Sequence, residues 1–385
     1  MSSLLITGIA ELATVDADDR VLHDAALVIE RDSIAWIGSI KSAPSTDRRV
    51  DLGGRAMLPG WVDSHSHLVF AGDRAAEFVA RMAGEPYAAG GIAVTVDATR
   101  TARVDQLRDV VETRVWEALL GGTTCLETKT GYGLDVEHER VSAEIAAEFV
   151  DEVTFLGAHL VPDGSSADDY VDLVCGQMLS EVVPHVSWID VFCEIGAFDV
   201  DQSRRILEAG RAVGLGLRVH GNQLGHSGGV GLAVELGAAS VDHCNYLSDH
   251  DIEALAHSDT VATVLPACDL STRAPFAPAR QLLDAGARVA IASNCNPGTS
   301  YTSSMNFCVA TAVLQMGLTL GEAIAAATRG GARALRRTDV GQIAIGSRAD
   351  LHVLDAPSAT HLAYRPGMPL TWAVWRAGVP YGIEV

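Results

Sequence analysis

The chain has few basic residues for its length and no long apolar run. Only 28 of its 385 residues are Lys or Arg, against 49 Asp or Glu, so its formal net charge is −21. This balance disfavours nucleic acid and anionic membrane surfaces as partners, because both are negatively charged. No apolar segment approaches the roughly 18 residues that span a bilayer. We therefore expect a small-molecule partner, with no nucleic acid and no membrane.

Cysteine is also sparse. The seven cysteines include no CxxC pair and no dense cluster, which argues against a disulfide framework and against a cysteine-based zinc module. The first residues lack the basic stretch and the long apolar segment of a secretion signal, and Glu11 and Asp16 follow soon after. We therefore expect a cytoplasmic protein.

Apolar residues make up 48% of the chain, enough for a large buried core. Residues 1–58 carry short strand-like segments broken by polar turns, which predict a small antiparallel sheet. From residue 59 to about 339, short apolar segments alternate with amphipathic ones, which favours βα units and a parallel sheet. The helices are expected at 104–119, 136–150, 200–213, 229–236, 249–257 and 320–335.

After residue 339 the pattern returns to short strands, expected at 341–346, 350–355 and 372–375. We therefore predict an α/β protein in which residues 59–339 form a (β/α)8 TIM-like barrel. Residues 1–58 and 340–385 would together build a small composite β-sandwich domain.

The sharpest local motif is Asp63-Ser64-His65-Ser66-His67, which follows an apolar segment. Side chains two residues apart on a strand share a face, so His65 and His67 would point together. Imidazole nitrogens are good zinc ligands, so the pair is a natural start to a metal site. Taken alone, the pair is equally consistent with two unrelated polar histidines near a loop.

His159, His220 and His243 each follow a strand-like segment. The active-site groups of a (β/α)8 barrel sit at the C-terminal strand ends, where these histidines would lie. Any one of them could be structural, but five histidines at matching positions favour a shared site. The histidines that we treat as ordinary, in helical or surface-like contexts, are His23, His138, His185, His250, His257, His352 and His361.

A polar loop follows the apolar run at 289–291. Its residues Asn294, Asn296, Gly298 and Thr299 offer backbone and side-chain groups that could hydrogen-bond a substrate carboxylate or amide. A plain strand-to-helix loop would also use Asn-Pro-Gly, so both interpretations stay open at this point.

Together these motifs resemble the metal-dependent amidohydrolase superfamily over nearly the whole chain. Its features are Pro59-Gly60 leading into His65 and His67, the later His220 and His243, a polar residue at a late strand end, and the tail 341–351. Four further segments, in order, are similar to the imidazolonepropionase family, which opens 4-imidazolone-5-propanoate to N-formimidoyl-L-glutamate in histidine degradation. They are Val69–Arg74, Lys129–Asp135, Phe155–His159 and Asn296–Thr299.

The resemblance implies one Zn²⁺ or iron ion per subunit, which would polarise the ring carbonyl and acidify the attacking water. It implies His65, His67, His220 and Asn294 as metal ligands, with His243 beside the attacking water. Substrate binding is implied for Arg74, Tyr132, His159, Asn296, Gly298 and Thr299, and Gln223 is expected both in the pocket and in catalysis. The planar fork of Arg74 suits the substrate's propionate, although without the resemblance Arg74 could cap a loop and Tyr132 could be a packing residue.

Asn294 departs from the family pattern, which has an aspartate there as a metal contact and base. Asparagine carries no charge and cannot accept the proton. We therefore expect a metal site with reduced turnover, since general-base assistance is worth about 10²–10⁴-fold. His243 is the most plausible substitute base.

Two alternatives stay open. The chain could be another cyclic-amide hydrolase or a heterocycle deaminase of the same superfamily, and a deaminase needs no propionate clamp. It could also be a catalytically weak ligand-binding variant, which only Asn294 suggests. We expect a homodimer, because a symmetric dimer is the commonest soluble assembly.

Overall fold

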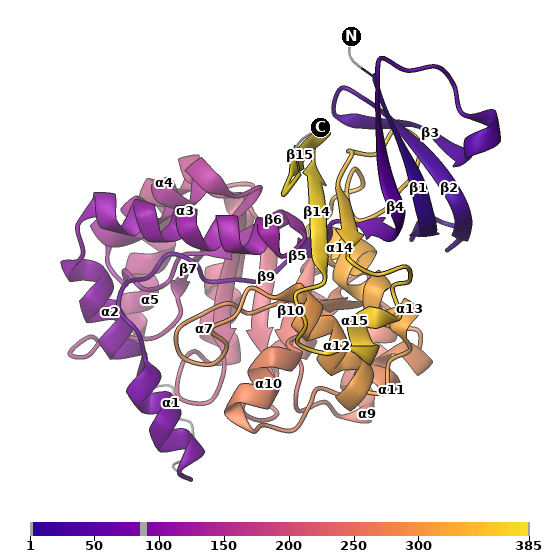
Figure 1. Cartoon of the computed structure of the whole chain (residues 1–385). Coiled ribbons are helices and arrows are strands. Elements are labelled where there is room, and N and C mark those ends of the chain that lie inside the picture. Colours follow the sequence, from indigo (N-terminus) through magenta and orange to yellow (C-terminus); the bar gives the residue numbers. More distant parts are fainter. Residues whose placement is uncertain (1–2, 85–90, 384–385) are drawn as a thin grey trace. The chain divides into compact units, whose positions relative to one another are not determined.

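The computed structural model describes residues 3–84 and 91–383 (Figure 1). The chain divides into two compact units. Unit 1 comprises Met1–Asp63, Trp116–Cys125 and Ser304–Val385, and unit 2 comprises Ser64–Val115 and Leu126–Ser303. The domain limits expected from the sequence, 1–58 with 340–385 and 59–339, stay a prediction.

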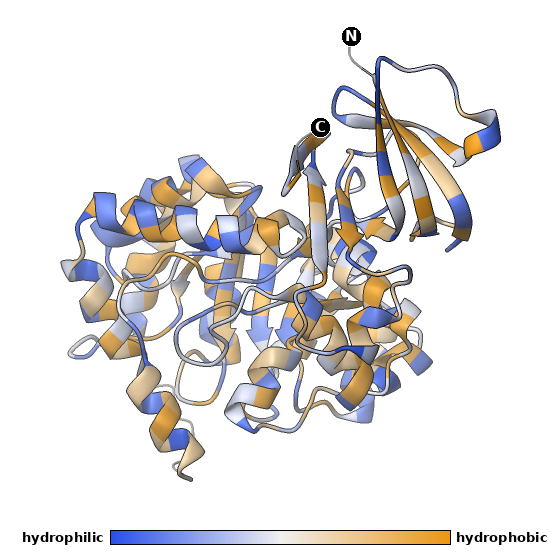
Figure 2. Cartoon of the chain, viewed as in Figure 1, coloured by the Kyte–Doolittle hydropathy of each residue, from blue (hydrophilic) through white to orange (hydrophobic). Residues whose placement is uncertain are grey.

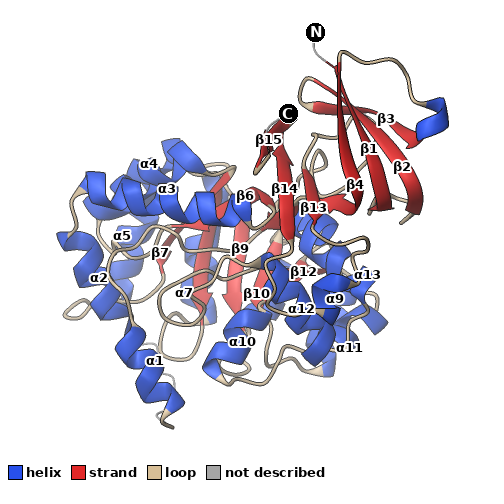
Figure 3. Ribbon diagram, viewed as in Figure 1, coloured by secondary structure: helices blue, strands red, loops and turns tan. Residues whose placement is uncertain are grey.

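Unit 1 contains a seven-stranded sheet in the order β15-β14-β13-β4-β1-β2-β3, to which both chain ends contribute as the sequence predicts (Figure 3). Its neighbours are antiparallel except β1 and β4, which run parallel; β2 and β3 supply the crossover connection that a parallel pair needs. The strands are β1 Ser3–Ala13, β2 Val21–Glu30, β3 Ser33–Ser39, β4 Arg48–Pro59, β13 Leu351–Leu354, β14 Thr371–Arg376 and β15 Val379–Tyr381.

The core of unit 1 lies on this sheet. Ile6, Leu27, Leu351 and Trp375, from four different strands, are fully buried in one cluster. Figure 2 shows the corresponding hydrophobic colour along β1, β2 and β4. Burial of such large apolar side chains stabilises the unit by roughly 1.5–3 kcal/mol each.

The strand expected at 341–346 is absent, which corrects that prediction. Gly341 and Gly346 both have positive φ angles, +77° and +90°, which interrupt extended backbone. The N–H of Ile343 donates to the carbonyl of Thr14 at 2.7 Å, so this segment is a loop that is hydrogen-bonded to the segment that follows β1.

The expected helix at 320–335 forms as α13 Leu320–Ala325, a π-helical turn Ala326–Gly330 and α14 Gly331–Ala334, beside α12 Met305–Gln315 and α15 His361–Tyr364.

The predicted (β/α)8 barrel is confirmed. Eight strands follow one another in the order β12-β11-β10-β9-β8-β7-β6-β5. Within unit 2 the ring is closed where Ser66 forms a parallel bridge with Cys295. The strands are β5 Trp61–Asp63, β6 Thr123–Lys129, β7 Glu152–Ala158, β8 Trp188–Cys193, β9 Gly216–Gly221, β10 Ser240–His243, β11 Val261–Val264 and β12 Val289–Ile291.

Helices fill the connections, and several begin at the caps that the sequence supplies. Asp199 and Ser248 form capping boxes with Gln202 and Asp251, which satisfy the first free N–H groups of α7 and α9. No helix in residues 3–84 or 91–383 is long and apolar enough to cross a membrane. The helices are α1 Ala75–Met82, α2 Ile92–Thr101, α3 Val104–Leu120, α4 Val136–Phe149, α5 Ala167–Leu173, α6 Leu179–Val182, α7 Val200–Ala212, α8 Gly229–Glu235, α9 Asp249–Ala256, α10 Pro266–Thr272 and α11 Ala279–Asp284.

Candidate active site

Four histidines from the C-terminal ends of the barrel strands converge in unit 2. The Nε2 atom of His67 lies 3.3 Å from Nε2 of His65 and 3.4 Å from Nε2 of His220. Candidate ligand atoms of His65, His220 and His243 all lie within 4.8 Å of one another. Several ring nitrogens turned toward one point in a buried space fit a shared cation, because each can offer a lone pair.

Burial favours the neutral form of His65, His67 and His243. It lowers the pKa of each of these rings well below the usual value, and the positive charge of Lys129 adds to this. Burial also lowers the pKa of His159 to about 3. A neutral imidazole is the form that ligates a metal, so the environment suits metal binding.

Two carboxylates hold the rings from behind. Nδ1 of His65 lies 2.7 Å from Oδ2 of Asp242, and Nδ1 of His220 lies 3.0 Å from Oδ2 of Asp190. A proton on Nδ1 of His65 leaves its Nε2 as the free lone pair, which fixes the tautomer and the orientation of that ring. Burial by itself would raise the pKa of Asp242, but Arg218 and Lys129 outweigh it and keep the carboxylate ionised.

These carboxylates belong to a fully buried charge network. Nζ of Lys129 lies 2.9 Å from Oε1 of Glu127 and 3.0 Å from Oδ2 of Asp190, and Nη2 of Arg218 lies 3.3 Å from Oδ2 of Asp242. With all groups ionised, three carboxylates face two cations, so the network carries one net negative charge beside the neutral histidines. That charge favours a cation at the histidine cluster.

Sequence reasoning missed this network, although a signal was present. Glu127, Lys129, Asp190, Arg218 and Asp242 all lie inside short strands of the barrel. A charged residue inside a buried strand must be paired, so charges on neighbouring strands of a barrel are expected to meet.

A pocket opens at the histidine cluster and gathers almost all the candidate site residues. Within the described ranges, no Asp or Glu lines this pocket. Two apolar residues, Ile92 and Phe192, also line it, and no sequence motif marks either of them. Two of the candidate site residues do not line the pocket: His65, which belongs to the histidine cluster, and Gly298, which lies against Arg74. The lining residues are His67, Arg74, Ile92, Tyr132, His159, Phe192, His220, Gln223, His243, Asn294, Asn296 and Thr299.

The aromatic side of the pocket is built from stacked rings. The ring of His159 stacks on that of His67 with centroids 5.5 Å apart, and the ring of Tyr132 lies 5.4 Å from that of His159. Nδ1 of His159 lies 3.0 Å from the carbonyl of Gly131 and donates to it, which leaves Nε2 as an acceptor. These flat walls suit a planar heterocycle.

The opposite side is the loop after β12, which its own hydrogen bonds make rigid. Oδ1 of Asn296 accepts the N–H groups of Gly298 and Thr299, both at 2.8 Å. Nδ2 of Asn294 lies 3.3 Å from Oγ1 of Thr299. Asn294 and His243 have φ angles of +52° and +84°, a region that non-glycine residues rarely adopt and that often marks functional sites.

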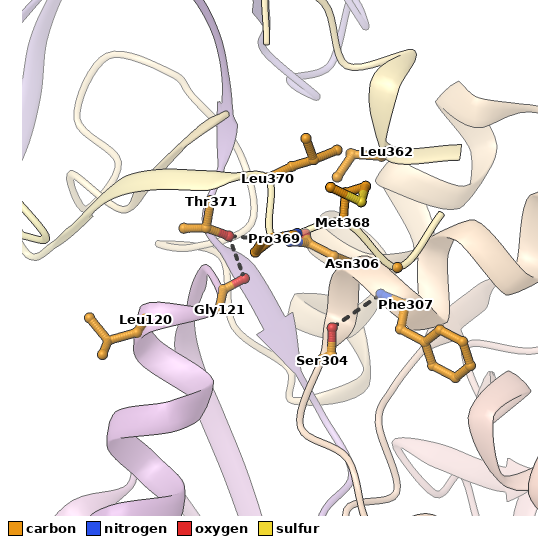
Figure 4. Close-up of a pocket in the computed structure, with 11 residues that line it drawn as sticks. Leu120, Gly121, Ser304, Asn306, Phe307, Leu362, Met368, Pro369, Leu370 and Thr371 are labelled. Atoms are coloured by element: carbon orange, nitrogen blue, oxygen red, sulfur yellow. Dashed lines mark hydrogen bonds between the residues drawn. The ribbon is translucent and has the colours of Figure 1, made fainter. Parts of the chain in front are cut away.

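A second cavity, of about 320 Å³, lies in unit 1 and contains none of the candidate site residues (Figure 4). Its polar groups are already engaged. Asn306 donates to Oγ1 of Thr371 at 3.2 Å, and Thr371 donates to the carbonyl of Gly121 at 3.2 Å. The cavity therefore offers no group set suited to hydrolysis.

The chain is closely similar to proteins of known activity. A model of the amidohydrolase family matches residues 189–375. The chain is 65% identical to the imidazolonepropionase of Paenarthrobacter aurescens (strain TC1), with 98% of each chain covered. It is 58% identical to the imidazolonepropionase of Mycolicibacterium smegmatis, with 98% of this chain and 97% of that protein covered.

Solved structures share the fold at lower identity. A variant of atrazine chlorohydrolase from Arthrobacter aurescens TC1, complexed with zinc and atraton, matches with a TM-score of 0.76 and 21% identity over 97% of this chain and 94% of that one. An adenosine deaminase from Xanthomonas campestris with bound zinc matches with a TM-score of 0.75 and 20% identity over 98% and 92%. At this identity the likeness concerns the fold alone.

Proposed function

The chain belongs to the imidazolonepropionase family of amidohydrolases, and from this membership we propose how its pocket opens the ring of 4-imidazolone-5-propanoate. The chain is a hydrolase that acts on a cyclic amide in histidine degradation, and the product is N-formimidoyl-L-glutamate. Water adds to the ring carbonyl carbon, the adjacent C–N bond breaks, and the departing nitrogen takes the proton.

The observation that carries this proposal is one pocket that joins a histidine cluster to a buried arginine. Arg74 lines the same pocket as His67, His220 and His243. Its guanidinium, almost fully buried, would receive the substrate's propionate, while Tyr132 and His159 would flank the planar ring. Gln223, Asn296, Gly298 and Thr299 would complete the walls and their hydrogen bonds.

His65, His67 and His220 would hold the metal, with the amide oxygen of Asn294 as a fourth contact. The family and the His/Asp groups of the structure support a metal; we propose a single Zn²⁺ or iron ion per subunit, since imidazole ligands suit both. Such an ion would polarise the ring carbonyl and acidify a water molecule.

His243 would move the proton. No carboxylate lines the pocket in the part of the chain that the structure describes, and neither Asn294 nor Gln223 can act as a base. Burial keeps the imidazole of His243 neutral, so it can take a proton from the attacking water and return it to the departing ring nitrogen. Asn294 would leave this step slower than an aspartate would.

The test is hydrolysis of 4-imidazolone-5-propanoate by the metal-loaded protein in isotopically labelled water. We expect N-formimidoyl-L-glutamate with one labelled oxygen in the new carboxylate. Intact substrate after prolonged incubation with the metal-loaded protein would overturn the proposal and favour the ligand-binding variant. We further propose a cytoplasmic homodimer, which sedimentation of the purified protein and fractionation of cells would test.

A further inference from the structure

We propose that Glu77 and Arg81 are positioning residues that hold the guanidinium of Arg74 in place for the carboxylate of the substrate. This inference rests on the proposed function, because it requires a carboxylated ligand in the pocket. The three residues follow one another at spacings of three and four along α1, from its N-cap Arg74 to Arg81 in its last turn. Arg74 and Arg81 are only 6% and 5% exposed.

Glu77 engages one edge of the Arg74 fork. Nε of Arg74 donates to Oε2 of Glu77 at 2.7 Å, and Nη2 donates to Oε1 at 2.8 Å. A guanidinium has five N–H groups in a fixed plane. Pairing through Nε and Nη2 therefore leaves the Nη1 end of the fork for the pocket and fixes the plane in which it lies.

Two glycines leave room for this pair. A Cβ on Gly298 would overlap Nη1 of Arg74, and a Cβ on Gly91 would overlap Nη2 of Arg74 and Oε2 of Glu77. Gly91 has an ordinary helical φ of −62°, so the absence of a side chain serves space and not backbone conformation. The guanidinium thus lies against two glycines, Gly91 and Gly298.

Arg81 ties the pocket loop to the same carboxylate. Its Nη1 donates to the carbonyl of Gly298 at 3.0 Å and lies 3.8 Å from Oε1 of Glu77. Glu77 therefore links the arginine that would bind substrate to the arginine that anchors the loop beside it. Two guanidinium groups and one carboxylate leave a net charge of +1, which a carboxylate of the ligand would balance.

Removal of Glu77 should change the affinity for a carboxylate ligand in opposite directions, depending on whether Glu77 positions Arg74 or only acts through its charge. If Glu77 merely competed with the ligand for Arg74, its removal would tighten carboxylate binding. If it positions Arg74, its removal weakens binding, because the freed guanidinium must be ordered when the ligand binds. The same logic applies to Gly298→Ala, which changes no charge.

The experiment compares imidazole-4-propanoate with its primary amide by calorimetry on the metal-loaded full chain. We expect Glu77→Gln and Arg81→Met each to raise Kd for the propanoate about tenfold, the scale of one charge-assisted hydrogen bond, and to leave Kd for the amide nearly unchanged. Gly298→Ala should raise Kd for the propanoate by a similar factor. Arg81→Lys should restore part of the loss, and thermal melting confirms that each variant folds.

The matched control is Glu137→Gln on α4. Glu137 also pairs with an arginine three residues on, Arg140, but its side chain is 68% exposed and away from the pocket lining. We expect no change in either Kd. Tighter propanoate binding in Glu77→Gln, or unchanged propanoate binding in Gly298→Ala, would overturn the positioning role while the proposed function stands. A wild-type protein that does not prefer the propanoate to the amide would overturn both.

Discussion

Nδ1 of His65 lies 2.7 Å from Oδ2 of Asp242, and both side chains are fully buried. The carboxylate fixes the proton of His65 on Nδ1 and turns Nε2 toward the other histidines. Asp242 therefore acts on the candidate metal centre without lining the pocket.

Asp242→Asn should weaken metal binding. The amide has no negative charge with which to polarise His65, and loss of such an outer partner typically costs about 10–100-fold in metal affinity. Competition with a chromogenic chelator measures this directly. Asp259→Asn, which changes an exposed carboxylate paired with Arg288, is the control; equal metal affinity of the two variants would contradict the role given to Asp242.

Arg74→Lys should raise KM more than it lowers kcat. Lysine keeps the positive charge but cannot present two parallel N–H groups to a carboxylate. We expect KM for 4-imidazolone-5-propanoate to rise on the order of 10–100-fold, as for the loss of a charge-assisted hydrogen bond. Steady-state kinetics decide the matter, and an unchanged KM would show that the fork is not the carboxylate site.

Asn294→Asp should raise turnover. The new carboxylate would lie in a pocket that otherwise has none among its described lining residues, beside neutral histidines. We expect kcat to rise at least tenfold at matched metal content, toward the ~10²–10⁴-fold worth of general-base assistance. Equal rates for both forms would mean that His243 alone supplies the base.

Asp269 provides a pH-dependent test of stability outside the pocket. Burial raises the pKa of this carboxyl to about 7, even though Asn245 and the N–H of Ala277 stabilise its ionised form. Because the folded pKa lies above the unfolded one, near 3.9, the folded state holds a proton that the unfolded state has lost. Its contribution to stability is full below pH 4 and is lost as the pH rises through about 7.

Asp269→Asn removes this titration. We expect the difference in Tm between the variant and the wild type to shift by a few degrees in favour of the variant as the pH is raised from 5 to 8. Asp284→Asn changes an exposed aspartate and should show no such trend. Parallel Tm profiles for wild type and Asp269→Asn would contradict the raised pKa.

The sequence predicted those parts of the molecule that local pattern determines. The barrel follows from the alternation of strand and helix patterns, and His159, His220 and His243 were singled out because each follows a strand-like segment. For His352 only the expected helical or surface-like context was wrong: it lies in β13, fully buried, with a pKa lowered to about 3 by burial. Its burial depends on the sheet around it, which one short segment does not reveal.

The parts that escaped prediction depend on neighbours in space. Lys129 and Asp190 are 61 positions apart in the sequence. They nevertheless form an ion pair of 3.0 Å between β6 and β8, the two strands on either side of β7. Arg81 and Gly298 meet only because the barrel closes. The parallel pairing of β1 with β4 likewise follows from the whole sheet, since the hairpin pattern of the first strands favours antiparallel neighbours.

The most direct test of the account is the rate at which the wild-type chain consumes 4-imidazolone-5-propanoate, measured as isolated, after chelation and after metal is restored, beside a heterocyclic amine as a deaminase substrate. We predict slow but clear hydrolysis of the imidazolone that chelation abolishes and metal restores, with no release of ammonia from the amine. Ammonia release from the amine without imidazolone hydrolysis would contradict the account and identify a deaminase on the same fold.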